Sequence, residues 1–314
     1  MNELHLSTFG DGRQDVYWCH GVFGQGKNFT RVAKDLLATD PDAYRCILVD
    51  LPNHGRSPWT ETFSYRDMAD ILARTVRATS GNRPTHLLGH SMGGKVVMRT
   101  VLDNPDLARS LTVVDMAPVD SRLIGLAPLV DAMKSVNLTA LTTRRQAEKQ
   151  MSDRVPDPNI RQFLLQNLRH ETGENEHWYW QMNLDLLGNG LSDIGSWPSV
   201  TSTWNGPALW ITAEQSNYVG PDHSQAMHEL FPQVRRIRVK NSGHWVHSDQ
   251  PGIFVQVLAA FLSAVPGTSR PSLKLSPSQP SQSWCQPLGK GRRPQSPYER
   301  FRRYSRHRPY RYFQ

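Results

Sequence analysis

The sequence predicts an α/β protein with a mostly parallel central sheet, helices on both faces of the sheet and an inserted helical cap. Between residues 16 and 114, short apolar runs alternate with amphipathic helical patterns, as in βαβ units. From about residue 118 to 200 the pattern is helical and lacks strong strand signals. Strand-like runs then return, so the sheet is expected to be completed after the insertion.

Each of the first four expected strands ends close to Gly, His, Asp or Pro, where a turn is favoured. The expected strands cover residues 16–20, 46–51, 85–89, 111–115, 208–212 and 234–240. The expected helices cover residues 29–38, 68–79, 93–103 and, after the last strand, 251–265. Strand and helix alternate before the inserted cap, and two strands followed by a helix come after it.

The basic residues are concentrated at the end of the chain. Residues 266–314 hold eleven Lys and Arg against one acidic residue, a net charge of +10, so the remaining residues carry −2. The pI of about 9.6 therefore describes this tail, and no nucleic-acid binding is expected of the body.

We predict one domain over residues 1–265, with the cap at about 118–200. Residues 266–314, rich in Pro, Ser and Arg, are predicted to be a disordered basic tail whose partner is left open.

Compartment signals are weak in this sequence. Residues 1–12 show no basic stretch followed by an apolar run, so neither a secretory signal nor an obvious transit peptide is expected. The longest mostly apolar stretch, residues 253–265, is shorter than the roughly 20 residues of a spanning helix. We therefore expect a soluble, intracellular, cytoplasmic protein without a transmembrane segment.

A Gly-x-Ser-x-Gly motif is centred on Ser91, directly after the expected strand at residues 85–89 and before a helical pattern. The motif alone occurs often by chance, but this context is typical of the sharp turn that presents a nucleophilic serine. Glycine at the flanking positions lets neighbouring backbone pass without a Cβ clash, and the helix N-terminus favours negative charge on the hydroxyl. We expect Ser91 to be the nucleophile of an α/β-hydrolase fold.

A serine hydroxyl needs a base that removes its proton, and His244 is the best-placed histidine. It follows the last expected strand, in the chain position that the base takes in this fold. His247, three residues later, is the nearest rival and is expected to be structural.

The carboxylate that orients the histidine is harder to assign. An aspartate is usual after the strand at residues 208–212, but Ser216 stands there, and Glu214 comes too early. Asp115 ends the preceding strand and can reach the same imidazole, so we prefer it, although it could also be an ordinary turn-capping residue. The alternative acid is Asp185 in the cap, which would require the cap to fold back over the histidine.

Two backbone N–H groups must stabilise the oxyanion that forms on attack. One is expected from Met92, which follows the nucleophile, and the other from Val22, or alternatively Phe23, in the Gly-rich loop after the first strand. The same loop matches most of a phosphate-binding P-loop, but Asn28 stands where that motif needs Ser or Thr. No His-Glu-x-x-His motif occurs and the three cysteines are scattered, so neither a metal nor another cofactor is expected.

Taken together, several segments resemble the YbfF-type bacterial esterases and the eukaryotic alpha/beta hydrolase domain-containing protein 11 family. The segments are residues 20–24, 50–58, 89–95, 115–119 and 243–247, within a resemblance that spans about residues 4–265. The resemblance implies a carboxylesterase or acyl-thioesterase, with Asp115 as the acid in the YbfF-type members and Asp185 in the eukaryotic ones. It also implies acyl esters, lipids or acyl-CoA thioesters as substrates and a mitochondrial location, although no mitochondrial leader is visible.

The expected function is therefore hydrolysis of a small-molecule acyl ester or thioester by a Ser-His-Asp mechanism. Its main rival is a noncatalytic α/β-hydrolase fold that binds a ligand without turnover. The aromatic residues of the cap could line an acyl pocket, but packing within the cap explains them equally well: Trp178, Tyr179, Trp180 and Trp197.

Overall fold

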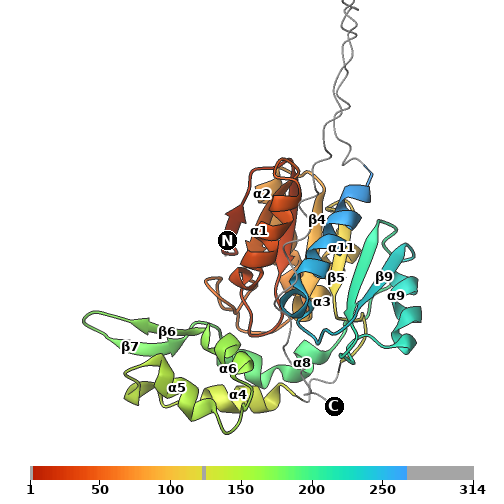
Figure 1. Cartoon of the computed structure of the whole chain (residues 1–314). Helices are drawn as coiled ribbons and strands as arrows, with labels where there is room; N and C mark the ends of the chain where they lie inside the picture. Colours follow the sequence, from red (N-terminus) through yellow and green to blue (C-terminus); the bar gives the residue numbers. More distant parts are fainter. Residues whose placement is uncertain (1–2, 122–124, 267–314) are drawn as a thin grey trace, which may run out of the picture. The chain divides into compact units, whose positions relative to one another are not determined.

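A computed structural model of the chain describes residues 3–121 and 125–266 (Figure 1). Seven strands form its central sheet in the order β1-β3-β2-β4-β5-β8-β9. The strands are β1 (Leu6–Phe9), β2 (Gln14–Cys19), β3 (Tyr44–Val49), β4 (Thr85–His90), β5 (Ala108–Val114), β8 (Ala208–Ala213) and β9 (Val234–Val239). Every neighbouring pair is parallel except β1 with β3, which confirms the mostly parallel sheet.

The two edges of the sheet differ from its buried centre. β4 and β8 are buried along their whole length, as their continuous apolar runs predict. β9 carries exposed arginines, which discourage pairing with a further strand. β1 was not predicted, because it has only four residues and is largely half-buried, so it lacks a long apolar run.

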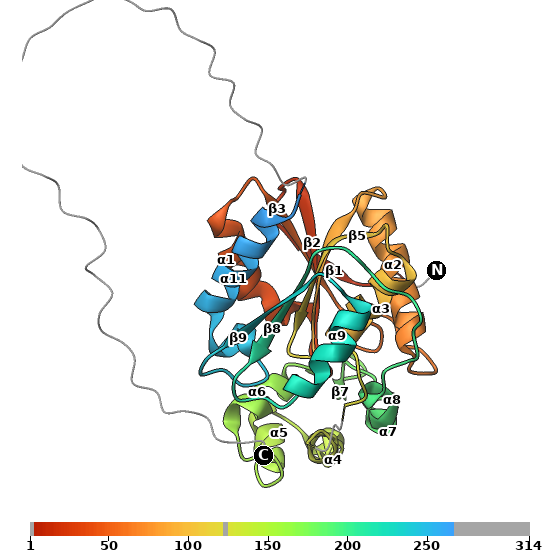
Figure 2. The ribbon, with the colours of Figure 1, turned by 90° about the vertical axis from the view of Figure 1, so that its right-hand side faces the viewer.

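Helices cover both faces of the sheet (Figure 2). α1 (Thr30–Thr39) and α11 (Pro251–Ala264) pack on one face around Trp18 and Phe254. α2 (Tyr65–Ser80) and α3 (Met92–Asp103) cover the other face. The remaining elements of this core are the 3-10 helices η1 (Gly26–Phe29) and η3 (Pro221–His223) and the helices α9 (Ser224–Leu230) and α10 (Val246–Asp249).

The cap leaves the core after β5 and returns before β8, so it is attached at the carboxyl edge of the sheet (Figure 1). Its helices are α4 (Ala127–Lys134), η2 (Leu138–Ala140), α5 (Arg144–Met151), α6 (Pro158–Leu165), α7 (Leu184–Asn189) and α8 (Leu191–Gly195). The cap is not wholly helical, because β6 (Leu168–Glu171) and β7 (His177–Trp180) form an antiparallel hairpin. The sequence predicts a helical region here, but the aromatic run in β7 forms a strand, because aromatic residues favour strands.

The predicted basic tail lies outside the described residues, apart from its first residue, Pro266. Within the described part, no helix has the length and apolar content needed to cross a membrane.

Candidate active site

Ser91 lies at the sharp turn between β4 and α3. Its backbone angles are φ 53° and ψ −121°, a strained conformation for a residue with a side chain. A Cβ on Gly89 would lie 2.1 Å from the carbonyl oxygen of Gly93, and one on Gly93 would lie 2.4 Å from that of Cys19. Only glycine fits at either position, so the motif is required by the turn itself.

The structure brings His244 and Asp115 together although they are 129 positions apart. Nδ1 of His244 donates to Oδ2 of Asp115 at 2.8 Å, and the carboxylate is buried. The loop of His244 is also held next to Ser91, since Nε2 of His90 donates to the carbonyl oxygen of His244 at 2.9 Å. With Nδ1 carrying the proton, Nε2 of His244 is the nitrogen that can accept another one.

Two further groups fix the Asp115 carboxylate. The N–H of Ala213 donates to Oδ1 at 3.0 Å, and the hydroxyl of Ser216 donates to Oδ2 at 2.5 Å. Ser216 stands after β8, at the position where an aspartate is usual in this fold. Its hydroxyl binds the carboxylate of Asp115, which follows the neighbouring strand β5. Sequence reasoning noted Ser216 only as a missing acid and did not predict this role.

An aromatic ring completes the surroundings of His244. The ring of Tyr218 stacks on the imidazole with centroids 4.2 Å apart. Burial, and then the negative charge of Asp115, raise the pKa of the Tyr218 hydroxyl. The ring therefore stays neutral and restricts the imidazole to one plane.

Asp185, the alternative acid, lies elsewhere. It is in the first turn of α7, its side chain is 87% exposed, and it pairs with Lys134 of α4 at 3.1 Å. The structure does not bring it to His244.

The candidate oxyanion loop is a tight turn closed by a hydrogen bond from the N–H of Gly24 to the carbonyl of Gly21. Phe23 has a φ of 61° within this turn, and its N–H donates to Nε2 of His54 at 3.2 Å. Within the described residues, the N–H groups of Val22 and Met92 have no such acceptor. This difference favours Val22 over Phe23 as the second donor.

Four buried histidines surround this region in neutral form. His20 accepts the N–H of Leu51 through Nε2, as His54 accepts that of Phe23. Burial lowers the pKa of His20, and burial lowers the pKa of both His54 and His247 to about 3. Burial also lowers the pKa of His90 well below its usual value. His247 is thus buried and neutral beneath the site, and no local sequence pattern predicted the other three.

The cap is bound directly to the loops of the site. Nδ2 of Asn167, between α6 and β6, donates to the carbonyl of Phe23 at 2.8 Å. The N–H of Asn183 donates to the carbonyl of Asn53, in the loop after β3, at 2.9 Å. The oxyanion loop is therefore held by both cap and core.

The cap aromatics serve packing in this structure. Trp178 stacks on His170 at 4.4 Å within the hairpin, and Trp180 is buried in the main core cluster.

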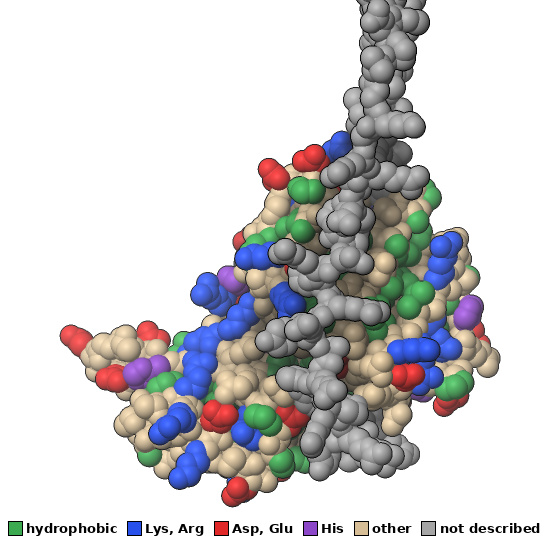
Figure 3. Space-filling view, in the orientation of Figure 1, with side chains coloured by type: hydrophobic (Ala, Val, Ile, Leu, Met, Phe, Trp, Pro, Cys, Tyr) green, Lys and Arg blue, Asp and Glu red, His purple; other side chains and the backbone are tan. Residues whose placement is uncertain are grey.

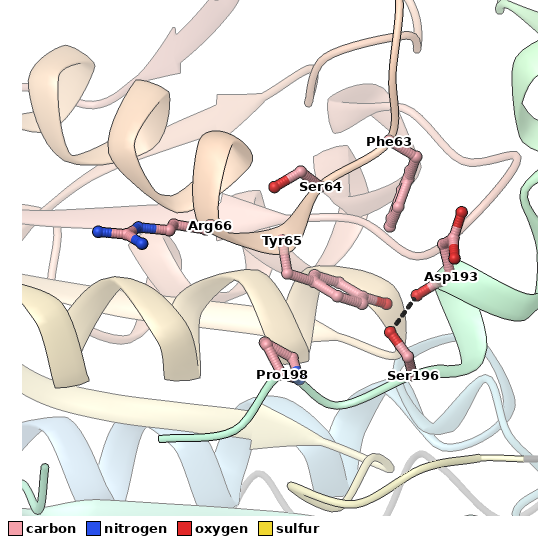
Figure 4. A pocket seen from close by; sticks show the side chains of 7 residues that line it. All are labelled: Phe63, Ser64, Tyr65, Arg66, Asp193, Ser196 and Pro198. Atoms are coloured by element: carbon pink, nitrogen blue, oxygen red, sulfur yellow. Dashed lines mark hydrogen bonds between the residues drawn. The ribbon is translucent and has the colours of Figure 1, made fainter. Parts of the chain in front are cut away.

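A hollow of about 210 Å³ at the start of α2 is lined by none of the candidate catalytic residues (Figure 4). Among the described residues, no group of three or more His, Cys, Asp or Glu could hold a metal ion.

Comparison with known proteins agrees with this architecture. Residues 16–251 match the family described as alpha/beta hydrolase fold. The chain belongs to this family. It is 36% identical to the sn-1-specific diacylglycerol lipase ABHD11 of Mus musculus, over 79% of this chain and 80% of that protein. It is 31% identical to the esterase YbfF of Escherichia coli K12, over 78% of this chain and 91% of that protein.

A solved structure gives the same picture. A marine microorganism esterase superposes with a TM-score of 0.78 at 29% identity, over 83% of this chain and all of that one. These similarities confirm the fold and the resemblance that the sequence motifs predicted.

Proposed function

We propose that this alpha/beta hydrolase is a serine carboxylesterase or acyl-thioesterase. The observation that carries the proposal is the hydrogen bond between His244 and Asp115, held beside a serine in the strained turn that exposes a nucleophile. The named lipase and esterase relatives support acyl esters, including lipid esters, as the substrate class. Coenzyme A thioesters are included because the same chemistry cleaves them.

In the proposed mechanism Nε2 of His244 takes the proton of Ser91, and Oγ attacks the acyl carbonyl. The N–H groups of Met92 and Val22 stabilise the oxyanion. Protonated His244 passes its proton to the leaving alcohol or thiol, which departs as the acyl-enzyme forms. A water deprotonated by His244 then releases the acid, while Asp115 holds the imidazole in the required tautomer.

A fluorophosphonate probe tests this proposal because it labels only activated serines. The wild-type chain should be labelled and should hydrolyse p-nitrophenyl esters, and Ser91→Ala should lose both properties. Ser152→Ala, at a half-buried position at the end of α5, is the matched control and should retain both. A folded wild-type chain that is neither labelled nor active would favour the noncatalytic ligand-binding fold instead.

A further inference from the structure

Four basic side chains lie around the seam between the cap and the loops after β2 and β3. We call them the cation cluster: Lys27 of η1, Arg56 of the loop after β3, Arg144 of α5 and Arg169 of β6. Figure 3 shows Lys and Arg side chains on the face where core and cap meet. Lys27 and Arg56 belong to the core, and Arg144 and Arg169 belong to the cap.

Hydrogen bonds bring the two cap arginines together and join one of them to the core. Nη2 of Arg144 and Nη1 of Arg169 donate to the same acceptor, the carbonyl oxygen of Leu168, at 2.8 and 3.2 Å. Nη2 of Arg169 also donates to Oε1 of Gln25 at 3.4 Å. Gln25 stands two residues before Lys27, so this bond places Arg169 beside the start of η1.

The cluster lacks acidic partners. In residues 3–121 and 125–266, no carboxylate lies within 4.0 Å of a charged nitrogen of any of its four members. Burial and then the charges of Arg169, Arg144 and Arg56 lower the pKa of Lys27, against the opposing effect of Asp50. That carboxylate already accepts the N–H groups of Gly26 and Arg56. Gathered cations without a counterion form a site for an anion.

The position of the cluster relates it to the proposed chemistry. Lys27 and Arg56 follow β2 and β3, and β2 is the neighbour of β4, which ends before Ser91. Neighbouring strands lie about 4.8 Å apart. Because β2 lies between β3 and β4, these two strands are separated by roughly 10 Å. A group bound at the cluster would therefore belong to a part of the substrate remote from the reacting carbonyl.

We propose that the cation cluster binds a phosphate group, carried on the portion of the substrate beyond the bond that is cleaved. This inference rests on the proposed function only in calling the bound molecule a substrate. The anion site itself does not depend on turnover. Its phosphate could come from a soluble phosphorylated thiol or alcohol or from a phospholipid headgroup at a membrane surface. The two sources are separated by the experiment.

Binding is measured on the full-length Ser91→Ala chain, so that the result does not depend on catalysis. Coenzyme A is the soluble phosphate probe, pantetheine is its phosphate-free match, and vesicles of phosphatidylcholine with or without phosphatidylglycerol are the membrane probe. The test variant is Lys27→Gln/Arg56→Gln, since neither side chain makes a hydrogen bond or ion pair within the described residues. The control variant is Arg235→Gln/Arg236→Gln, whose two arginines are exposed on β9, an edge strand of the sheet. It loses the same positive charge as the test variant and keeps the same basic tail.

The proposal expects coenzyme A to bind more tightly than pantetheine, and the Lys27/Arg56 variant to weaken its binding at least about tenfold while the β9 variant does not. The same pattern with phosphatidylglycerol vesicles, and not with coenzyme A, would assign the phosphate to a lipid headgroup. Equal losses in both variants would reflect net charge alone and overturn the proposal, as would no loss in either. Fluorophosphonate labelling of the Lys27/Arg56 variant with Ser91 intact reports separately on the proposed function.

Discussion

At the scale of single residues, the site depends on one buried carboxylate with three donors. Asp115 accepts from Ala213, Ser216 and His244, and its own φ of 48° turns the chain out of β5 toward them. The candidate acid thus follows β5, one strand before the usual position, and Ser216 at that position completes its hydrogen bonds. Asp115, and not Asp185, is therefore the carboxylate that contacts His244.

Asp115→Asn is expected to lower kcat by about four orders of magnitude, because an amide cannot hold His244 in the required tautomer. Asp185→Asn is the control and should stay within about twofold, since its carboxylate is exposed and contacts Lys134. Steady-state hydrolysis of p-nitrophenyl butyrate measures both. A large loss in Asp185→Asn with an active Asp115→Asn would exclude the assignment.

Ser216→Ala should have a smaller effect of roughly tenfold on kcat. It removes one hydrogen bond to a charged group but leaves the contact with His244 in place. Thr at the same position keeps a hydroxyl, so Ser216→Thr should recover most of the loss in the same ester assay. Equal activities of the Ala and Thr variants would show that the hydroxyl is not needed.

At the scale of elements, a buried lysine joins the cap to α3, the helix that follows Ser91. Nζ of Lys95, one turn after Ser91 on α3, donates to the carbonyls of Gly195 and Ser196 at the end of α8, at 2.7 and 2.8 Å. The hydroxyl of Tyr65 donates to the carbonyl of Ile194 at 2.6 Å. The carbonyls that end α8 therefore find their donors on the core.

Lys95→Met should loosen this end of the cap, because it fills similar space but leaves two carbonyls without a donor, at about 1–3 kcal/mol for each group. We expect faster amide exchange over residues 190–198 by mass spectrometry and a higher KM for long-chain esters. The exposed Lys134→Met is the control. Unchanged exchange in Lys95→Met would show that α8 is held by other contacts.

The elements differ in how well the sequence predicts them. The buried parallel strands and the turn at Ser91 follow from apolar runs and glycine spacing, and chain order favours His244, which the structure places on Asp115. The short edge strand β1 and the hairpin β6–β7 lack such patterns. Contacts between distant loops, such as Ser216 with Asp115 or Arg169 with Gln25, depend on how the cap and sheet assemble, so no local signal announces them.

At the scale of the whole molecule, buried neutral histidines make folding sensitive to acid. Burial lowers the pKa of His86 to about 3, as it does for His54 and His247. Their folded pKa values lie below the unfolded value of about 6.5, so the unfolded chain binds more protons between about pH 6.5 and 3. Their contribution to stability is therefore complete above pH 6.5 and is lost as the pH falls.

Each such histidine removes up to about 1.4 kcal/mol of stability for every pH unit within that window. Together they should unfold a protein of ordinary stability near pH 5, as followed by urea denaturation with tryptophan fluorescence at pH 7, 6 and 5. His86→Gln should make the pH dependence shallower. Its hydrogen-bond partners Ser110 and Gln14 lie near the amino-terminal ends of β5 and β2, whereas Ser91 follows the carboxyl end of β4. The variant should therefore keep esterase activity at pH 7. A wild-type stability that is constant down to pH 4 would mean that these histidines become protonated without disturbing the fold.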